Sequence, residues 1–213
     1  MSVAVLRIDD LPAEPWRNGG SRTRPIAAHP SGTGDLLWRV SAAEIVANGP
    51  FSAFPGIDRV FVPLRGDGVR LRALDGSFDR CCNTIGEPFR FAGEVPLEAT
   101  LLGSPVRALN VMVRRGAARA AVRAVQGEGT PEPGDVWLLV AVRGEWSVQV
   151  PGDAASVLRP GEAALPVPAD VAARWSPRRS STRPSVTSSP ACSSTTACCA
   201  RVRPSRWRRT TSR

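Results

Sequence analysis

Polar and apolar residues alternate along most of the chain, with the period of two that half-buried β-strands show. The clearest case is 58–64, where every second residue from Asp58 shares one face and every second residue from Arg59 shares the other. This stretch ends in Arg-Gly-Asp-Gly, a tight-turn signal because glycine adopts the positive φ of hairpin turns. The run 69–74 then alternates again. We predict a β-hairpin here, with the pair Asp58–Arg59 at its entrance, and we place the functional end of the molecule there.

The same pattern predicts further strands before and after this hairpin. They cover 3–8, 21–28, 36–45, 89–91, 97–101, 106–114, 136–142, 146–150 and 163–167. The segment 79–88 reads as irregular. The segment 117–125 could form a strand or a short helix, because its alanines are compatible with both. In 36–45, Trp38 shares a face with Val40 and Arg39 lies on the other. Short strands between Gly/Pro turns are typical of a sandwich or barrel, so we predict an all-β fold.

A weak internal repeat suggests two barrels in tandem. The segment 64–67 resembles 142–145, and each lies between two predicted strands. A Gly/Pro/Glu-rich linker follows the first set of strands at 127–134. We therefore expect an N-terminal barrel over 1–126 and a C-terminal half over 127–175, which N-terminal strands would complete.

Composition adds a basic tail to this picture. The net charge is +9, yet residues 1–173 hold 18 basic and 19 acidic residues, a net charge of −1; ten arginines and no acidic residue follow. Over 176–213 the alternation is lost, so we expect no packed core and a disordered segment. The segment 176–213 fits three interpretations: an arm that binds nucleic acid, a solvated tail, or the product of a frameshift in the gene. The arginines lack interleaved aromatics or an RNA-binding signature, which favours an unselected or frameshifted tail over a nucleic-acid partner.

The remaining composition indicates a cytoplasmic protein without a membrane partner. The five cysteines include no CxxC spacing, which favours a reducing compartment. The first ten residues do not resemble a signal peptide, and no apolar run is long enough to span a bilayer.

Most familiar catalytic chemistries lack their residues here. His29 is the single histidine, so the set of histidines that holds a metal in many small β-barrels cannot be assembled, and we expect no metal and no cofactor. No Gly-x-Ser-x-Gly elbow or Walker motif accompanies it. We read Cys81–Cys82 as structural or incidental. We assign no catalytic residue.

Arginine and asparagine side chains among apolar strand residues are the strongest candidates for a binding site. These residues are Arg39, Arg59, Asn110 and Arg114. Guanidinium groups in a partly apolar barrel mouth suit a carboxylate, which they bind through two charge-assisted hydrogen bonds. The alternative, equally consistent with composition, is that the arginines form structural ion pairs with Asp58, Glu44 and Glu94.

Ordered motifs give the chain a resemblance to the HutD/Ves family. They are PWRNGG at 15–20, WRVS at 38–41, GPFS at 49–52, FPGIDR at 54–59, FRFAG at 89–93, and NVM at 110–112 followed by Arg114 and Arg115. The resemblance covers roughly 1–175 and is densest over 15–115. Motifs of this number in one order are far more specific than a single short match.

The resemblance implies a bicupin, with two tandem cupin-like β-barrels. Members of the family accompany histidine-utilisation genes and are thought to act in regulation or metabolite sensing, without an established reaction. This chain departs from the family at Ser21, Pro25 and Ala108, where a glycine and two acidic residues are usual. The family's last strands should extend beyond Trp175. In this chain the arginine-rich tail begins there, so we expect the final strand to be missing, one sheet edge to be left open and stability to be reduced.

Our first hypothesis is a non-catalytic protein that binds a small carboxylate, such as the histidine-pathway intermediates formylglutamate or urocanate. The candidate ligand-binding residues are Trp16, Asn18, Arg24, Trp38, Arg39, Phe54, Asp58, Arg59, Asn110 and Arg114. The second hypothesis is a metal-free isomerase or hydrolase, with Glu44 or Asp58 as general base. A homodimer is left open.

Overall fold

The computed structural model describes residues 3–16, 21–30, 36–131, 136–165, 173–178 and 195–204. Over these residues the chain forms antiparallel β-sheets and one short 3₁₀-helix, η1 (Ile8–Asp10). The all-β prediction is confirmed. The region 117–125, left open between strand and helix, forms strand β12 (Ala118–Val125).

A six-stranded sheet lies at the centre of the N-terminal part. Its order is β2 (Glu14–Pro15), β3 (Ser21–Pro30), β4 (Leu36–Ile45), β11 (Val106–Arg114), β6 (Ile57–Arg65) and β9 (Phe89–Ala92). The strands β4, β11 and β6 are long and alternate as predicted. Consequently Val60 and Val62 point to one side of the sheet and Phe61 to the other.

A four-stranded sheet covers one face of the six-stranded sheet. Its order is β5 (Gly49–Pro50), β10 (Leu97–Leu101), β7 (Val69–Ala73) and β8 (Asp79–Cys82). Phe51, Phe61, Leu71 and Leu97 fill the core between the two sheets. The prediction that 79–88 is irregular is wrong for β8, because this short strand pairs with the edge of β7.

The C-terminal part contains a five-stranded and a three-stranded sheet. The first has the order β1 (Val5–Arg7), β16 (Glu162–Ala164), β13 (Val136–Arg143), β18 (Thr196–Pro204) and β12, and the second has the order β15 (Ser156–Leu158), β14 (Trp146–Gln149) and β17 (Arg174–Pro177). Between them lies a core rich in tryptophan, with Trp137, Trp146 and Trp175. Because β1 and β12 belong to the five-stranded sheet, strand pairing crosses the predicted boundary at 126/127.

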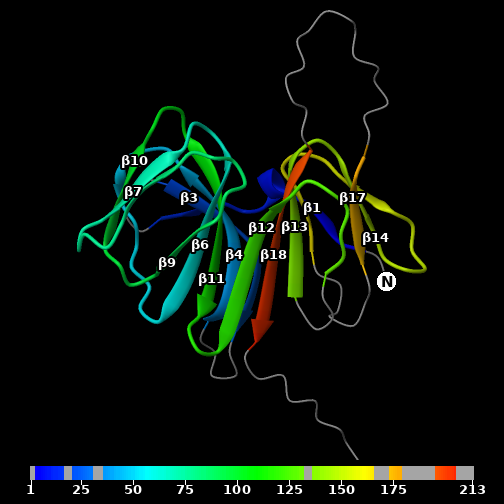
Figure 1. Ribbon diagram of the computed structural model, residues 1–213, viewed down its shortest axis with the longest axis horizontal. Helices are drawn as coiled ribbons and strands as arrows, with labels where there is room; N and C mark the ends of the chain where they lie inside the picture. Colours follow the sequence, from blue (N-terminus) through cyan, green and yellow to red (C-terminus); the bar gives the residue numbers. More distant parts are fainter. Residues whose placement is uncertain are drawn as a thin grey trace, which may run out of the picture.

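A third core joins the two parts. One face of the six-stranded sheet packs against the five-stranded sheet, with Val40, Val60 and Val111 on one side and Val122 and Val140 on the other. Figure 1 shows β4, β6 and β11 beside β12, β18 and β13, with β7 and β10 on the outer left and β14 and β17 on the outer right. None of the sheets in the described ranges closes into a barrel.

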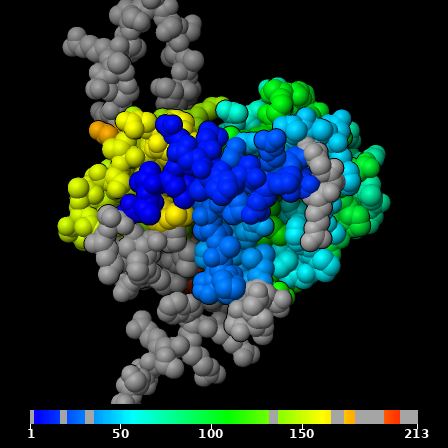
Figure 2. Space-filling view, turned by 180° about the vertical axis from the view of Figure 1, so that it is seen from behind, coloured from blue at the N-terminus to red at the C-terminus, as the bar shows by residue number. Residues whose placement is uncertain are grey.

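The N-terminal segment connects the two parts on the surface. Strand β1 pairs with β16, and β2 pairs with β3. Between them Ile8 is fully buried, and its backbone nitrogen donates to the carbonyl oxygen of Gly161 at 3.0 Å. Figure 2 shows this segment, in dark blue, lying across the junction between the two parts.

Strand β18 contradicts the expectation of a structureless tail for 196–204. It lies between β12 and β13 and pairs with both along its length. Cys198 and Val202 enter the central core, and Cys199 enters the tryptophan-rich core. Alanine and cysteine are small but bury readily, and backbone pairing does not depend on their size. The expected open edge is therefore filled by β18.

No helix among the described residues is long and apolar enough to cross a membrane. The cytoplasmic location remains a prediction.

Candidate functional site

The register of the six-stranded sheet places polar residues on the face that the four-stranded sheet covers. Met112 of β11 pairs with Arg39 on one side and Arg59 on the other, and Arg59 also pairs with Phe91. The next row on this face contains Ser41, Asn110 and Phe61. Directly paired residues share a face, so Arg59 and Asn110 face the same interior.

Arg59 is the central group of this interior, and its exposed fraction is only 4%. Its Nε and Nη2 donate to Asn110 Oδ1 at 3.4 and 3.3 Å, and its Nη1 donates to the carbonyl oxygen of Ser52 at 3.2 Å. Three phenylalanine rings surround the guanidinium, with centroids at 5.3 Å for Phe51, 5.3 Å for Phe54 and 5.1 Å for Phe91. Such contacts stabilise a cation that has lost its water.

In the described part of the chain, no carboxylate forms an ion pair with Arg59. Burial lowers the pKa of the guanidinium to about 10, so the group stays charged at neutral pH. Buried charges in proteins are normally paired. Arg59 is thus a buried cation whose contacts with the described residues are neutral.

A short loop before β6 forms the outer wall of the site. The backbone nitrogen of Phe54 donates to Gly93 at 2.7 Å, and the nitrogen of Gly93 donates to Ile57 at 2.6 Å. A Cβ at Gly93 would lie 2.7 Å from the Ile57 oxygen and 2.8 Å from the Phe54 oxygen. Glycine is therefore required for this close approach. The loop holds Phe54, 37% exposed, at the boundary with solvent.

Other candidates lie at the margins of this site or outside the described residues. Trp16 contacts Phe51 edge-on at 5.2 Å. Arg39 shares the face of Arg59, but its Nη2 donates to Glu14 at 3.0 Å. The Nε of Arg114 donates to the carbonyl oxygen of Leu36 at 3.0 Å.

Asn18 lies outside the described residues. Of the predicted ligand-binding residues, the structure brings Arg59, Asn110 and Phe54 together, with Trp16 behind Phe51.

The other three candidates are not at this site. Trp38 is buried in the central core on the opposite face of the sheet. Asp58 accepts a hydrogen bond of 2.7 Å from Arg115, which also contacts Glu94. Arg24 donates to the carbonyl oxygen of Leu11 at 2.5 Å. The structural ion pairs considered as the alternative in the sequence analysis are present at Asp58 and Glu94, and their partner is Arg115.

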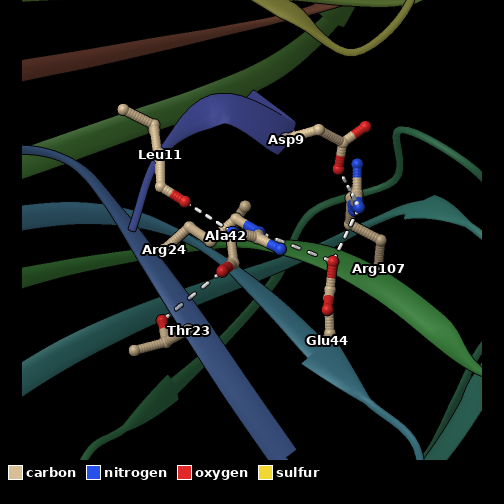
Figure 3. A network of polar contacts seen from close by, with 7 residues as sticks. All are labelled: Asp9, Leu11, Thr23, Arg24, Ala42, Glu44 and Arg107. Carbon is tan, nitrogen blue, oxygen red and sulfur yellow. Dashed lines mark hydrogen bonds and ion pairs between the residues drawn. The ribbon is translucent and has the colours of Figure 1, made fainter. Parts of the chain in front are cut away.

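Arg107 organises a separate polar network on that opposite face, shown in Figure 3. Its Nη2 donates to Asp9 at 2.5 Å and to Glu44 at 2.6 Å, and the Glu44 carboxylate also lies 3.7 Å from Arg24 Nε. The hydrogen bond from Arg107 lowers the pKa of Asp9 below its ordinary value. This network ties η1 to β3, β4 and β11.

We expect Glu44→Gln to destabilise the fold by about 1–3 kcal/mol, because hydrogen bonds to charged groups contribute about this much and Arg107 would lose one of its two carboxylates. Urea unfolding at neutral pH measures the change. Glu98→Gln is the matched control, since Glu98 is 48% exposed and contacts Arg72 at the surface; its effect should stay within about 0.5 kcal/mol. Equal effects of the two substitutions would contradict a structural role for the network.

Sequence reasoning missed several residues of these two sites. Phe51, Ser52 and Phe91 lie inside the GPFS and FRFAG motifs, but only their contacts with Arg59 show what they do. For Arg107 the sequence holds no usable signal, because its partner Asp9 is 98 residues away. In the described ranges, no group of three His, Cys, Asp or Glu side chains could hold a metal ion.

Comparison with known proteins identifies relatives of this chain. The HutD family model matches residues 8–178. Protein Ves of Citrobacter koseri is 36% identical over 142 residues, which cover 66% of this chain and 73% of that protein. An uncharacterized 21.2 kDa protein in the hutC 3′ region of Pseudomonas putida is 39% identical over 110 residues, which cover 51% and 56%.

Solved structures share the fold. HutD from Pseudomonas fluorescens SBW25 has a TM-score of 0.74 at 22% identity, covering 95% of this chain and 99% of that one. A cupin 2 conserved barrel domain protein from Leptotrichia buccalis has a TM-score of 0.56 at 10% identity, covering 96% and 98%. These identities are too low to carry more than the cupin-like fold.

Proposed function

The chain belongs to the HutD family, which is linked to the histidine-utilisation region, and on this premise we propose that it binds a small carboxylate metabolite at Arg59. The role would be regulatory or sensing rather than catalytic. Formylglutamate and urocanate are the proposed ligands, because both combine a carboxylate with a small, partly apolar or amide-bearing body.

The observation that carries this proposal is the buried Arg59, whose described contacts are all neutral. Moving a charge out of water costs several kcal/mol unless an opposite charge compensates. A ligand carboxylate would provide that charge and would match the planar guanidinium with two parallel hydrogen bonds. The surrounding phenylalanines would contact the apolar part of the ligand.

Asn110 supports the proposal with a second polar group. Its Oδ1 accepts from Arg59, which leaves the amide nitrogen as a donor toward the same interior. A ligand that carries a carboxylate and a carbonyl would use both residues. This requirement favours formylglutamate over a simple fatty acid.

The enzyme hypothesis finds less support in the geometry. Its proposed bases, Asp58 and Glu44, are held by Arg115 and Arg107, and both alternate to the face opposite Arg59. A general base must reach the proton it removes. If the protein forms a product from a histidine-pathway intermediate, and Asp58→Asn abolishes that product formation, the enzyme hypothesis would be favoured instead.

We also propose that each pair of facing sheets corresponds to one barrel of a bicupin. The six-stranded and four-stranded sheets enclose one core, and the five-stranded and three-stranded sheets enclose another. This division agrees with the cupin-like neighbours.

The proposal is tested by a thermal-shift screen of the full chain against histidine, urocanate, formylglutamate, glutamate and formate. A true ligand at one hundred times its dissociation constant should add about 2.7 kcal/mol of stability. We expect formylglutamate or urocanate to raise the melting temperature more than histidine does. A folded sample that responds to none of the five compounds would sink the proposal.

A further inference from the structure

We propose a second ligand site, a cleft between the six-stranded and five-stranded sheets that binds a small dianionic oxyanion through Arg65 and Arg143. The cleft has a volume of about 310 Å³. Its walls come from the end of β6, from β11, from η1, from the end of β13 and from the turn before β16. This site goes beyond the Arg59 site, because the six-stranded sheet separates the two.

Opposite faces of the sheet establish this separation. Arg107, which lines the cleft, pairs with Glu44 across β4, whereas Asn110 of the Arg59 site pairs with Ser41. Side chains an odd number of positions apart on a strand point to opposite faces. The cleft therefore opens on the side where the two parts of the molecule meet.

Positive charge dominates the lining of the cleft. Arg65, Arg107 and Arg143 line it together with one acidic residue, Asp9, for a net charge of +2. Arg107 is already compensated by Asp9 and by Glu44 behind it. Within the described residues neither Arg65 nor Arg143 forms an ion pair, and both are exposed. The pKa of Asp9 is lowered mainly by Arg107 and to a smaller extent by the charge of Arg65. Two guanidinium groups are thus left for a ligand.

The strand register places two arginines opposite each other at the end of β6. Arg65 lies directly opposite Arg107 in the pairing of β6 with β11, next to a register shift. Like charges directly opposite each other destabilise a sheet. Asp9 and Glu44 already offset the charge of Arg107, so the charge at this point that an oxyanion would neutralise is that of Arg65. Arg107 is only 11% exposed and is held in place by its two carboxylates. It would contribute positive charge at the base of the cleft without moving to contact the ligand.

The turn after β6 is built close to the mouth of the cleft. Gly66 lines the cleft and has a φ of +100°. A Cβ there would collide with the carbonyl oxygen of Pro105, so another residue would push the turn, and Arg65 with it, out of place.

The ligand class follows from charge, shape and volume. Two guanidinium groups with no ion pair among the described residues favour a dianion whose oxygens accept paired hydrogen bonds, namely a phosphate, a sulfate or a dicarboxylate. A volume of about 310 Å³ lies at the small end of metabolite sites. An oxyanion held by Arg65 and Arg143 would connect the two sheets.

Isothermal titration of the full chain with inorganic phosphate, sulfate and succinate, at constant ionic strength, tests the site. We expect saturable binding of at least one probe, with the strongest probe identifying the ligand class. Arg65→Gln and Arg143→Gln should each weaken this binding about ten-fold or more, because each removes a charge-assisted contact.

Two control variants distinguish binding in this cleft from binding elsewhere on the molecule. Arg119→Gln, an exposed arginine on β12, should leave binding of all three probes unchanged. Arg59→Gln should leave phosphate and sulfate binding unchanged, while succinate, a carboxylate, would lose any contribution from the first site. The absence of saturable binding, or an equal loss in Arg119→Gln, would overturn the second site. Loss in Arg59→Gln with full retention in Arg65→Gln and Arg143→Gln would overturn it as well.

Discussion

Removal of residues 196–213 is expected to abolish cooperative folding of the C-terminal part. Strand β18 lies between β12 and β13, so its loss leaves both neighbours without their hydrogen-bonding partner. It also opens two cores at once, since Cys198, Ala200 and Val202 pack in one and Ala197 and Cys199 in the other. A single large core truncation costs about 2–5 kcal/mol, and whole domains are stable by only about 5–15 kcal/mol. Losing the strand should therefore exceed the available stability.

Differential scanning calorimetry and tryptophan fluorescence follow this change, because Trp137, Trp146 and Trp175 all lie in a core that β18 helps to close. The matched control is the chain that ends at Pro204, where the pairing of β18 with β12 ends. The control should keep a cooperative melt. A cooperative melt of the shorter chain at the wild-type temperature would show that β18 does not hold the sheet together. Ligand experiments accordingly need the full chain.

Substitution of Arg59 by Met is expected to weaken carboxylate binding about 100-fold or more. Truncating one partner of a buried, hydrogen-bonded charge pair costs on the order of 2–5 kcal/mol, and Met is similar in length but carries no charge. In the ligand-free state the substitution removes a buried cation whose contacts with the described residues are all neutral. We therefore expect the melting temperature without ligand to stay the same or to rise.

Titration calorimetry with the best ligand from the screen measures this effect. Arg90→Met is the matched control, because Arg90 neighbours Phe91 on β9 but is exposed. Arg59→Lys should bind with intermediate affinity, since it keeps the charge and loses the planar fork. A ligand-free melting temperature that falls by many degrees in Arg59→Met, with affinity retained in the folded fraction, would make Arg59 a structural residue and not a ligand contact.

Alternation was a reliable guide wherever one strand has two differently packed faces. In 36–45 and 58–64 it separated the residues of the central core from those beside Arg59, and the structure agrees. The period of two fixes the face of every side chain once a strand forms. The same pattern failed for β18, whose small residues give little hydropathy contrast, so that its packing depends on partners supplied by β12 and β13.

By itself, the sequence determined the all-β class, the faces of the long strands and the motifs that resemble the HutD/Ves family. Only the tertiary structure decided which buried arginine has no carboxylate partner among the described residues. Arg107 finds Asp9 98 residues away and Arg115 finds Asp58 57 residues away, whereas Arg59 meets Asn110 and three phenylalanines. These partners are distant in sequence, and each ion pair depends on how separate strands are brought together. Local patterns therefore cannot distinguish a structural arginine from one left for a ligand.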